Sequence, residues 1–340
     1  MSDSNIYILA IESSCDDTAA AVLKNDKVLS NVVANQLVHN QYGGVVPELA
    51  SRAHQQNIVP VIDAALKKAN ISKKQLSAIA FTQGPGLLGS LLVGSSFAKS
   101  LVIGLDIPLI AVNHMHAHIM AHFIDEFGFD KPTFPFLALT ISGGHTQIVQ
   151  VNSYFDLEII GETTDDAVGE AFDKSAKILG LPYPGGPLVD KYAQLGNPNA
   201  FQFTKPKINR LDFSFSGLKT QILYFVQKNV AANQEFINDN LNDICASIQH
   251  TIINILMEKI TLAVAQTGIN QIAIGGGVSA NSGIRAAIKN TEITKGWKTF
   301  VPKFEYTTDN AAMIGIVGYQ KYLSSHFENQ SVTSKARIQF

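Results

Sequence analysis

Two segments of this chain, about 130 residues apart, repeat one pattern: an apolar strand, a short polar turn and a second apolar strand. They are residues 6–23, with the turn Glu12-Ser-Ser-Cys-Asp-Asp-Thr18, and residues 136–151, with the turn Ser142-Gly-Gly-His-Thr146. Each is typical of a β-hairpin. A third segment, residues 271–281, predicts a buried strand that runs into three glycines and then a helix. Together they predict an α/β chain of two similar halves with a nucleotide cleft between them.

The two turns differ in chemistry. Ser142-Gly-Gly-His-Thr146 is neutral and rich in hydrogen-bond donors, which suits an anion, because glycine lets backbone N–H groups approach phosphate oxygens. The first turn carries Glu12, Asp16 and Asp17, which suits a cation or an amine. The glycines at 275–277 would also admit an adenine ring. An ordinary hairpin turn remains the alternative for either turn taken alone.

Length and composition limit the possible number of domains, the kinds of partner and the compartment. With 340 residues, the chain exceeds what one compact core usually holds. Only 16% of the residues are charged, against about 25% in typical proteins, so apolar surface is left for a partner. The net charge of -2 gives no global attraction to nucleic acid. Two cysteines and no apolar presequence predict a cytoplasmic protein, and polar residues interrupt the apolar region 87–112, which argues against a membrane span.

Four of the nine histidines lie between positions 114 and 122. Residues 107–112 predict a buried strand, Asn113 is a good N-cap, and the histidines open the following helix. His114 and His118 then share one helix face and could bind one metal ion, with a carboxylate or water completing the shell. The alternative is that these are polar helix residues bonded to water and backbone. His116 would point away, and His122 would continue the His118 face.

A zinc-peptidase mechanism needs a glutamate base between two such histidines. No glutamate lies between His114 and His118, and Glu126 follows two turns later. The peptidase interpretation therefore lacks its base.

Prolines at 132 and 135 predict a boundary between lobes. We expect a first lobe over residues 1–133, a second over 134–323, and a polar tail over 324–340, whose return onto the first lobe is left open. Two amphipathic helices are predicted at 47–69 and 87–103, and the second carries small residues that allow close helix packing. Because the surface is poor in charge, we expect a partner protein on this first lobe.

Ten motifs in chain order resemble those of the TsaD/Kae family, the tRNA N6-adenosine threonylcarbamoyltransferases once labelled glycoprotein endopeptidases. The resemblance covers nearly the whole chain. The motifs are Glu12–Thr18, Pro47–His54, Gly84–Gly89, Asn113–His118, Ser142–Gln147, Asp173–Lys174, Tyr183–Pro187, Phe213–Lys219, Gly276–Asn281 and Thr308–Asn310.

The resemblance implies a two-lobed actin/Hsp70/sugar-kinase-like (ASKHA) fold. It also implies transfer of a threonylcarbamoyl group from threonylcarbamoyl-adenylate to N6 of adenosine 37, in tRNAs that read codons beginning with A, with release of AMP. The family's metal ligands fall on His114, His118 and Asp309, which we expect to converge from the two lobes. Iron is implied, and two imidazoles with one carboxylate would also hold zinc.

The resemblance further implies substrate-binding positions, and the acidic turn supplies the candidate catalytic residues. Asp190 suits a ribose hydroxyl pair, and Asp16 or Asp17 is the candidate that takes up the proton, with Glu12 as the third catalytic carboxylate. An adenylate is already activated, so Cys15 is not needed as a nucleophile. The adenylate-binding positions are Thr140, Ile141, Ser142, Gly143, Gly144, Asp173, Gly186, Asp190 and Asn281.

This chain departs from the family pattern at two places. Relatives commonly have glutamate where Asp17 stands, and many bacterial relatives have glutamate where this chain has His116. The first departure shortens the reach of a candidate base. The second shows that a glutamate between the two histidines is not indispensable if this chain is active.

Partners follow from the same resemblance: tRNA, a paralogous ASKHA subunit (TsaB-like) and a small ATPase (TsaE-like). Four cations near Leu211–Ser216 are candidates for contacting tRNA, with a solvated charged face as the alternative. They are Lys205, Lys207, Arg210 and Lys219.

A metallopeptidase or an ASKHA-type ATPase or kinase remains the alternative activity.

Overall fold

The structure is a computed structural model that describes residues 5–126, 128–206, 208 and 210–339. It divides into two compact units. The first takes the described residues up to Lys131 and those from Pro302 onward, and the second runs from Pro132 to Val301. Lys207 lies outside the described residues, so its predicted role in tRNA binding is not pursued.

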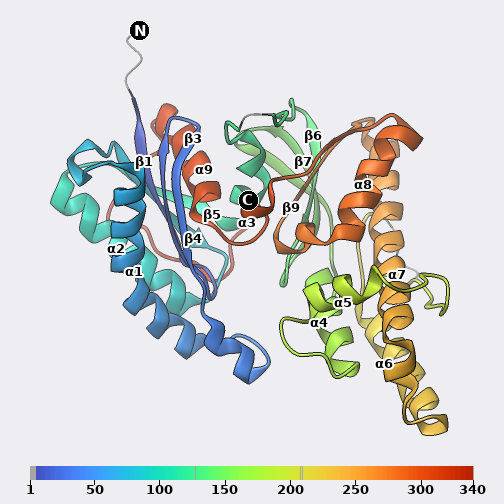
Figure 1. The fold of residues 1–340 in the computed structure, drawn as a ribbon. Coiled ribbons are helices and arrows are strands. Elements are labelled where there is room, and N and C mark those ends of the chain that lie inside the picture. The colour runs from blue at the N-terminus through green and yellow to red at the C-terminus, as the bar shows by residue number, and fades with distance from the viewer. Residues whose placement is uncertain (1–4, 127, 207, 209, 340) are drawn as a thin grey trace. The chain divides into compact units, whose positions relative to one another are not determined.

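The first unit is built on a five-stranded sheet in the order β3-β2-β1-β4-β5 (Figure 1). The first three strands are antiparallel, as the hairpin pattern predicts, and β4 and β5 continue in parallel with β1. Nearly every residue of β1 and β2 is buried, because helices cover both faces of the sheet. The strands are β1 (Tyr7–Glu12), β2 (Thr18–Lys24), β3 (Lys27–Ala34), β4 (Ala78–Gly84) and β5 (Leu109–Asn113).

Two long helices cover one face of this sheet. They are α1 (Pro47–Ala69), which begins with proline at its first position, and α2 (Leu88–Leu105). Helix α1 occupies the predicted range, and α2 begins one residue later and ends two residues later than predicted. By length and composition, α2 is apolar enough to cross a membrane, although one such helix is weak evidence for a span. In this fold its buried side, which includes Leu91, Ala98 and Val102, packs on β4.

The opposite face is covered by α9 (Ala311–Leu323), which the chain supplies only after completing the second unit. The expectation that the second lobe extends to residue 323 is therefore wrong, and α9 and the tail both belong to the first unit. The physical reason is burial: the first eight residues of α9 are buried on β1, β2 and β4, an apolar face that the sheet would otherwise expose to water. Between β5 and this layer lies α3 (His114–Met120).

The second unit repeats the same sheet topology, with the order β10-β9-β6-β7-β8. Here too a three-stranded antiparallel meander is extended by two parallel strands. The predicted second hairpin is thus confirmed, as is the mixed α/β fold class. The strands are β6 (Phe136–Ile141), β7 (Thr146–Ser153), β8 (Asp156–Glu162), β9 (Gln271–Gly275) and β10 (Lys298–Phe300).

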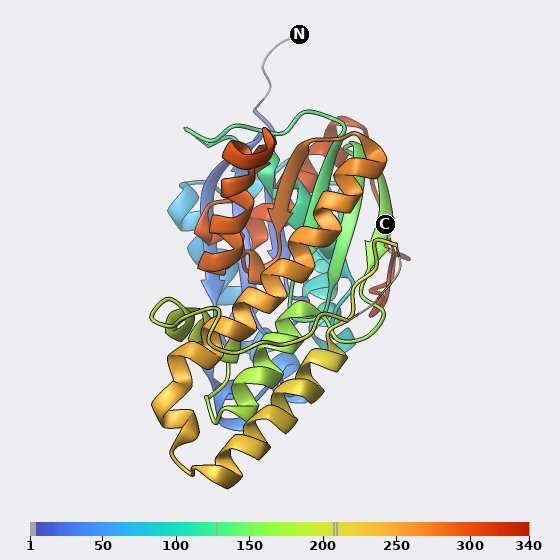
Figure 2. The same ribbon diagram turned by 90° about the vertical axis from the view of Figure 1, so that its right-hand side faces the viewer.

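Helices of the second unit bury one large apolar cluster that includes Phe172, Phe213 and Phe215. The 32-residue α7 and the shorter α8 lie side by side along the second sheet (Figure 2). The helices are α4 (Val168–Ile178), α5 (Gly185–Ala193), α6 (Ser216–Ala232), α7 (Phe236–Thr267) and α8 (Ser282–Lys295).

Close packing of α9 on the first sheet requires glycine. A Cβ added at Gly318 would lie 2.6 Å from the Cβ of Ala80 on β4 and 3.3 Å from a methyl of Ile8 on β1. Because the Ala80 Cβ is fixed to the backbone, it cannot rotate away. The helix and the sheet would have to separate to make room.

We therefore predict that Gly318→Ala lowers the free energy of unfolding by about 1–3 kcal/mol, measured by chemical denaturation. Gly104→Ala in α2 is the matched control, since an added Cβ there meets no atom within 4 Å. Adding Ala80→Gly to Gly318→Ala should recover much of the loss. Equal stability of Gly318→Ala and the natural chain would contradict this account of the packing.

Candidate active site

The histidine-rich helix α3 begins where the edge strand β5 ends. Asn113 caps it: the side-chain Oδ1 accepts hydrogen bonds from the backbone N–H groups of Met115 (2.8 Å) and His116 (3.1 Å). This confirms the strand, the cap and the helix start expected from the sequence. Every residue of α3 is buried, so its histidines face protein and not bulk water.

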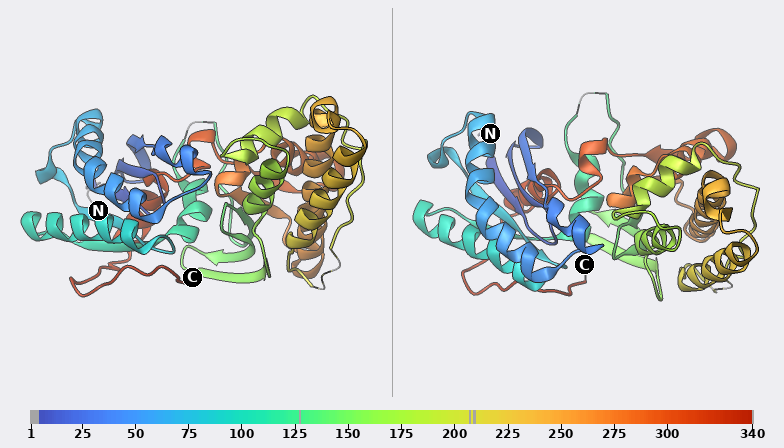
Figure 3. Two further views of the ribbon diagram at one scale, coloured as in Figure 1. Left: turned by 90° about the horizontal axis from the view of Figure 1, so that it is seen from below. Right: turned by 60° about the horizontal axis from the view of Figure 1, so that its bottom comes forward.

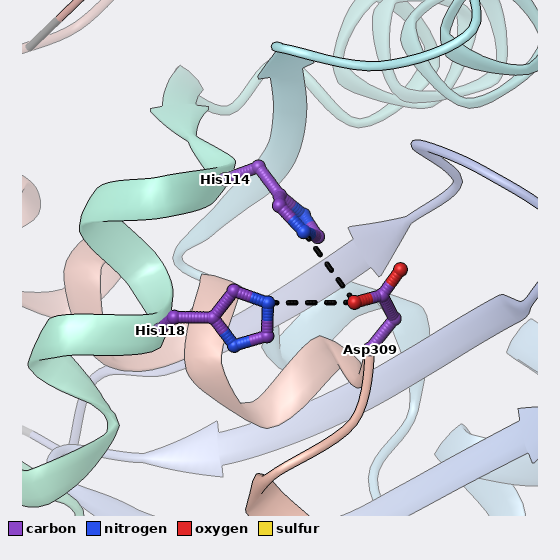
Figure 4. Close-up of side chains that lie close together, drawn as sticks. All are labelled: His114, His118 and Asp309. Carbon is purple, nitrogen blue, oxygen red and sulfur yellow. Dashed lines mark ion pairs between the residues drawn. The ribbon is translucent and has the colours of Figure 1, made fainter. Parts of the chain in front are cut away.

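His114, His118 and Asp309 converge at one point of the first unit (Figure 4). The Nε2 atoms of His114 and His118 each lie 3.4 Å from Oδ1 of Asp309. The two rings stand edge to face, with centroids 4.7 Å apart. Asp309 lies directly before α9, whose N-cap Asn310 accepts a hydrogen bond from the Met313 N–H at 3.0 Å. The predicted convergence is found, but all three ligands come from one unit, contrary to the expectation of two lobes.

The geometry of this trio suits a metal ion. Among the described residues, no hydrogen-bond partner is found for the buried Nδ1 of His118, and the carboxylate of Asp309, 3.4 Å away, faces its Nε2. A buried imidazole with so few partners is costly unless another ligand occupies its lone pair. One candidate ligand atom from each residue lies within 4.8 Å of the others. Two ligand atoms at about 2.0–2.1 Å from a tetrahedral zinc ion lie about 3.3 Å apart, close to the two distances of 3.4 Å between the histidines and Asp309. The residues present therefore fit a small divalent cation.

A buried carboxylate orients His114. Oε2 of Glu12 lies 3.0 Å from Nδ1 of His114, and Glu12 is fully buried. Glu12 also accepts hydrogen bonds from the Ser14 N–H (2.5 Å) and the Thr82 hydroxyl (2.7 Å). Because a carboxylate only accepts, Nδ1 carries the hydrogen and Nε2 is left to face Asp309. A carboxylate behind a histidine in this way is the usual support of a metal ligand.

The charges of the trio and of Glu12 also suit a bound cation. Burial opposes the charged form of Asp309, but His114 and His118 hold the pKa of this carboxyl well below its usual range. Burial would also lower the pKa of His114, yet Glu12 and Asp309 together raise it well above its ordinary value. Without metal, His114 thus carries a proton between two carboxylates. A dication would take the place of that proton.

The acidic turn lies beside this trio. Burial, followed by the charges of Asp309 and Asp16, raises the pKa of Asp17 to about 7, while the Asn35 amide donates to its Oδ1 at 2.8 Å. The turn itself is held by His54 of α1, which contacts the Thr18 hydroxyl at 2.7 Å and the Cys15 carbonyl at 3.0 Å. Burial raises the pKa of the Cys15 thiol far above neutrality, so this cysteine is a poor nucleophile.

In the second unit, the predicted phosphate turn adopts a closed form. The Ser142 N–H donates to the His145 carbonyl at 2.9 Å, and the His145 N–H donates to the Ser142 hydroxyl at 3.0 Å. An added Cβ at Gly143 or Gly144 would meet no atom of the described residues within 4 Å, so a ligand has room beside this backbone. The side chains of Thr140 and Ile141 are wholly buried. These two residues can therefore offer a ligand only their main chain.

Three other predicted ligand residues are already hydrogen-bonded within the protein. Asp173 accepts from the N–H groups of Gly185 and Gly186, both at 2.9 Å, at the start of α5. Asp190 accepts from the N–H (2.9 Å) and hydroxyl (2.7 Å) of Ser282.

Asn281 caps α8 by accepting from the Ile284 N–H at 3.0 Å, and it donates to the Gln249 side chain at 2.7 Å. These contacts join α4, α5 and α8 at one end of the second unit. Whether any of the three also touches a ligand stays a prediction.

Two glycines allow close packing around the phosphate turn. A Cβ at Gly276, whose φ is +86°, would lie 2.5 Å from the carbonyl oxygen of Ile141. A Cβ at Gly169 would lie 2.6 Å from the carbonyl oxygen of Ser142. Glycine at these positions lets the 275–277 turn and the start of α4 approach the phosphate turn.

Sequence reasoning missed the supporting residues Thr82, His54 and Gly169. Thr82 is a buried residue that follows four apolar residues in β4, and His54 lies on the buried side of an amphipathic helix, so each was a polar residue at a buried position. The sequence therefore marked Thr82 and His54 as unusual. It did not indicate which residues they contact, because Thr82 and Glu12 are 70 residues apart.

Comparisons with known proteins found close relatives that share one activity. The family described as "TsaD: tRNA N6-adenosine threonylcarbamoyltransferase" matches residues 27–316. The enzyme of that name from Christiangramia forsetii is 72% identical over 340 residues, covering 100% of both chains. That from Riemerella anatipestifer is 60% identical over 332 residues, covering 98% of this chain and 97% of the relative.

Among solved structures, full-length HypF is similar with a TM-score of 0.64 at 14% identity. The match covers 95% of this chain and 47% of HypF. At this identity the likeness shows the fold alone. With the repeated sheet topology, it confirms the expected ASKHA fold.

We predict that Glu12→Gln weakens Zn²⁺ binding about 10–100-fold, measured by isothermal titration calorimetry on the metal-free protein. The amide keeps the shape of the side chain but loses the charge that holds the His114 N–H. Glu48→Gln, which removes an exposed carboxylate on α1, is the control and should bind Zn²⁺ as the natural chain does. If Glu12→Gln bound Zn²⁺ with unchanged affinity, Glu12 would not be a support of the metal site.

Proposed function

This chain belongs to the family of tRNA N6-adenosine threonylcarbamoyltransferases, and on that premise we propose how its residues perform the transfer. It is a transferase that modifies tRNA. We propose threonylcarbamoyl-adenylate as the donor and N6 of adenosine 37 as the acceptor, in tRNAs that read codons beginning with A. The products are AMP and threonylcarbamoylated tRNA.

The observation that carries this proposal is the trio His114, His118 and Asp309, supported by Glu12. These residues would hold one divalent cation, with Fe²⁺ favoured and Zn²⁺ as the alternative. When bound, such a cation supplies Lewis acidity that polarises the carbonyl of the transferred group. Glu12 keeps the His114 ring in the tautomer that presents Nε2 to the ion.

The reaction itself needs no covalent intermediate. The N6 amine of adenosine attacks the threonylcarbamoyl carbonyl, a C–N bond forms, the C–O bond to the phosphate breaks, and AMP leaves. The amine loses one proton, which we assign to Asp17. A pKa of about 7 suits a group that takes up a proton at neutral pH, and Asp16 is the alternative acceptor.

We propose that the adenylate binds the second unit through the phosphate turn and the 275–277 turn. The open space beside Gly143, Gly144 and Gly277 supports this placement. Backbone N–H groups at such turns can bind phosphate oxygens. In this proposal the main role of three polar residues is to hold the helix ends beside the two turns. They are Asp173, Asp190 and Asn281.

A metallopeptidase would use the same histidines with a glutamate base. Glu12, which is the buried carboxylate nearest His114, is occupied by three donors and has no exposed surface, so it cannot activate a water molecule for attack on a peptide. An ATPase or sugar kinase of this fold would have no need of the trio.

We predict that the purified chain, given synthetic threonylcarbamoyl-adenylate, unmodified tRNA and Fe²⁺, forms threonylcarbamoyladenosine and releases AMP only when tRNA is present. Nucleoside mass spectrometry and AMP quantification measure the two products. His114→Ala should lose at least about 100-fold in rate, because it removes a ligand and its carboxylate support. His250→Ala, which removes an exposed histidine of α7, should match the natural chain. AMP release without tRNA, or peptide cleavage, would favour the alternatives.

The proposed TsaB-like partner has a fitting surface on the first unit. Helices α1 and α2 lie side by side on the outside of the first sheet (Figure 3). A groove between them is lined by Ser51, Ile58, Gly89, Leu92 and other residues of both helices. The large apolar side chains of Val59 and Leu92 are 58% and 49% exposed there and offer apolar surface to a partner.

We predict that Leu92→Arg weakens assembly with the TsaB-like partner by at least about tenfold, because a charge then replaces an apolar contact near the centre of the groove. Titration of the two purified proteins by calorimetry measures this affinity. Leu262→Arg on α7, which changes a half-exposed leucine in the second unit, is the control. Equal affinity of Leu92→Arg and the natural chain would place the partner elsewhere.

The tRNA surface and the compartment stay predictions. Lys205 is paired with Glu258 at 2.7 Å, which neutralises part of the expected positive patch. Buried Lys259 donates to the carbonyls of Ile208 and Arg210 and so shapes the same loop. We propose a cytoplasmic enzyme that works with tRNA, a TsaB-like subunit and a TsaE-like ATPase.

A further inference from the structure

The carboxy-terminal tail returns along the first unit. The Glu328 N–H donates to the Leu109 carbonyl of β5 at 2.8 Å. Further on, the Ser334 hydroxyl contacts the Ser95 hydroxyl of α2 at 2.9 Å. The Lys335 N–H then donates to the Gln83 carbonyl at 2.8 Å, at the end of β4. The tail thus passes from the edge strand to the turn that joins β4 to α2.

That turn, residues 84–87, is held from two sides. On one side lies the tail: the Gly86 N–H donates to the Ala336 carbonyl at 3.2 Å, and a Cβ at Gly84 would lie 1.9 Å from the Lys335 carbonyl oxygen. On the other side lies the acidic turn: the Leu87 N–H donates to the Ser14 carbonyl at 2.7 Å. The tail therefore supports the loop on which the acidic turn rests.

The tail also reaches the metal-binding helix. The Asn113 side chain uses both ends of its amide. Oδ1 caps α3 at Met115 and His116, and Nδ2 donates to the Gln339 carbonyl at 3.2 Å. The orientation of the cap, one residue before His114, is thus fixed by the last part of the chain.

We infer that residues 333–339 are a positioning segment of the active site, which fixes the acidic turn and the histidine helix relative to each other. The inference rests on the metal-binding role given to His114 under the proposed function. The acidic turn follows the end of β1 and the histidine helix follows the end of β5. Neither of them is itself hydrogen-bonded into the sheet. Main-chain hydrogen bonds from the tail restrict these parts, whereas the sheet and α9 already form the core without it.

The test compares full-length variants. Asn113→Ser keeps a neutral side chain that caps helices well but loses the donor to Gln339. We expect Co²⁺ affinity to fall about three- to tenfold, as for one lost hydrogen bond, with a changed visible spectrum of the bound ion and little change in melting temperature. Gln339→Ala is the matched control, because it keeps the main-chain carbonyl and should behave as the natural chain. Natural affinity and spectrum in Asn113→Ser would overturn the role of this contact.

A second variant tests the whole segment. A chain ending at Val332, which keeps the last tail residue that packs on the core, should bind Co²⁺ more weakly than the full chain, and a peptide of residues 333–339 added in trans should restore binding. Unchanged binding by the shortened chain would overturn the inference.

Amide hydrogen exchange separates this inference from the proposed function, since it needs no metal. In the shortened chain the Leu87, Met115 and His116 amides should exchange faster, whereas the Ile79 amide in β4 should not. If the full chain binds no Co²⁺, the metal proposal fails, and exchange alone then decides the role of the tail. Unchanged exchange at those three amides would contradict it.

Discussion

The first unit depends on one buried negative charge. Glu12 ends an apolar strand and has no exposed surface, so its carboxylate must be paired within the protein. The Ser14 N–H, the Thr82 hydroxyl and His114 supply that pairing. These contacts fix the acidic turn to β4 and to the histidine helix at the same time. Removing the charge would therefore loosen three elements together, which explains how a short turn keeps a defined position beside the metal ligands.

The two units show how one sheet topology can support two chemistries. In both, a hairpin turn lies at the end of the first two strands, next to the ends of the parallel strands. The first turn is acidic and lies beside imidazoles, where a cation is stabilised. The second is neutral, with open space at Gly143 and Gly144, where we propose that a phosphate would find N–H donors. The proposed division of labour between metal and adenylate follows from these few side chains and not from the fold itself.

Both ends of the chain build the first unit, which carries the proposed metal site. Asp309, α9 and the tail are made last, yet they complete a sheet whose strands are made first. As a result, the trio can form only when the chain has returned across its first sheet. Gly318 allows α9 to approach Ala80 closely, which brings Asp309, just before this helix, to the histidines. The contacts that complete the first unit thus also assemble the trio.

The sequence by itself determined the repeated hairpins, the Asn113 cap, the pairing of His114 with His118 on one helix face, and, through the family motifs, the choice of Asp309. These depend on local periodicity and on residue types, which short-range spacing expresses directly. Only the tertiary structure decided that Asp309 belongs to the first unit, that Glu12 supports His114, and that the tail contacts Asn113. Each of these joins residues at least 100 positions apart, and no local pattern encodes such a contact, because it depends on how the apolar faces of the elements are buried against one another.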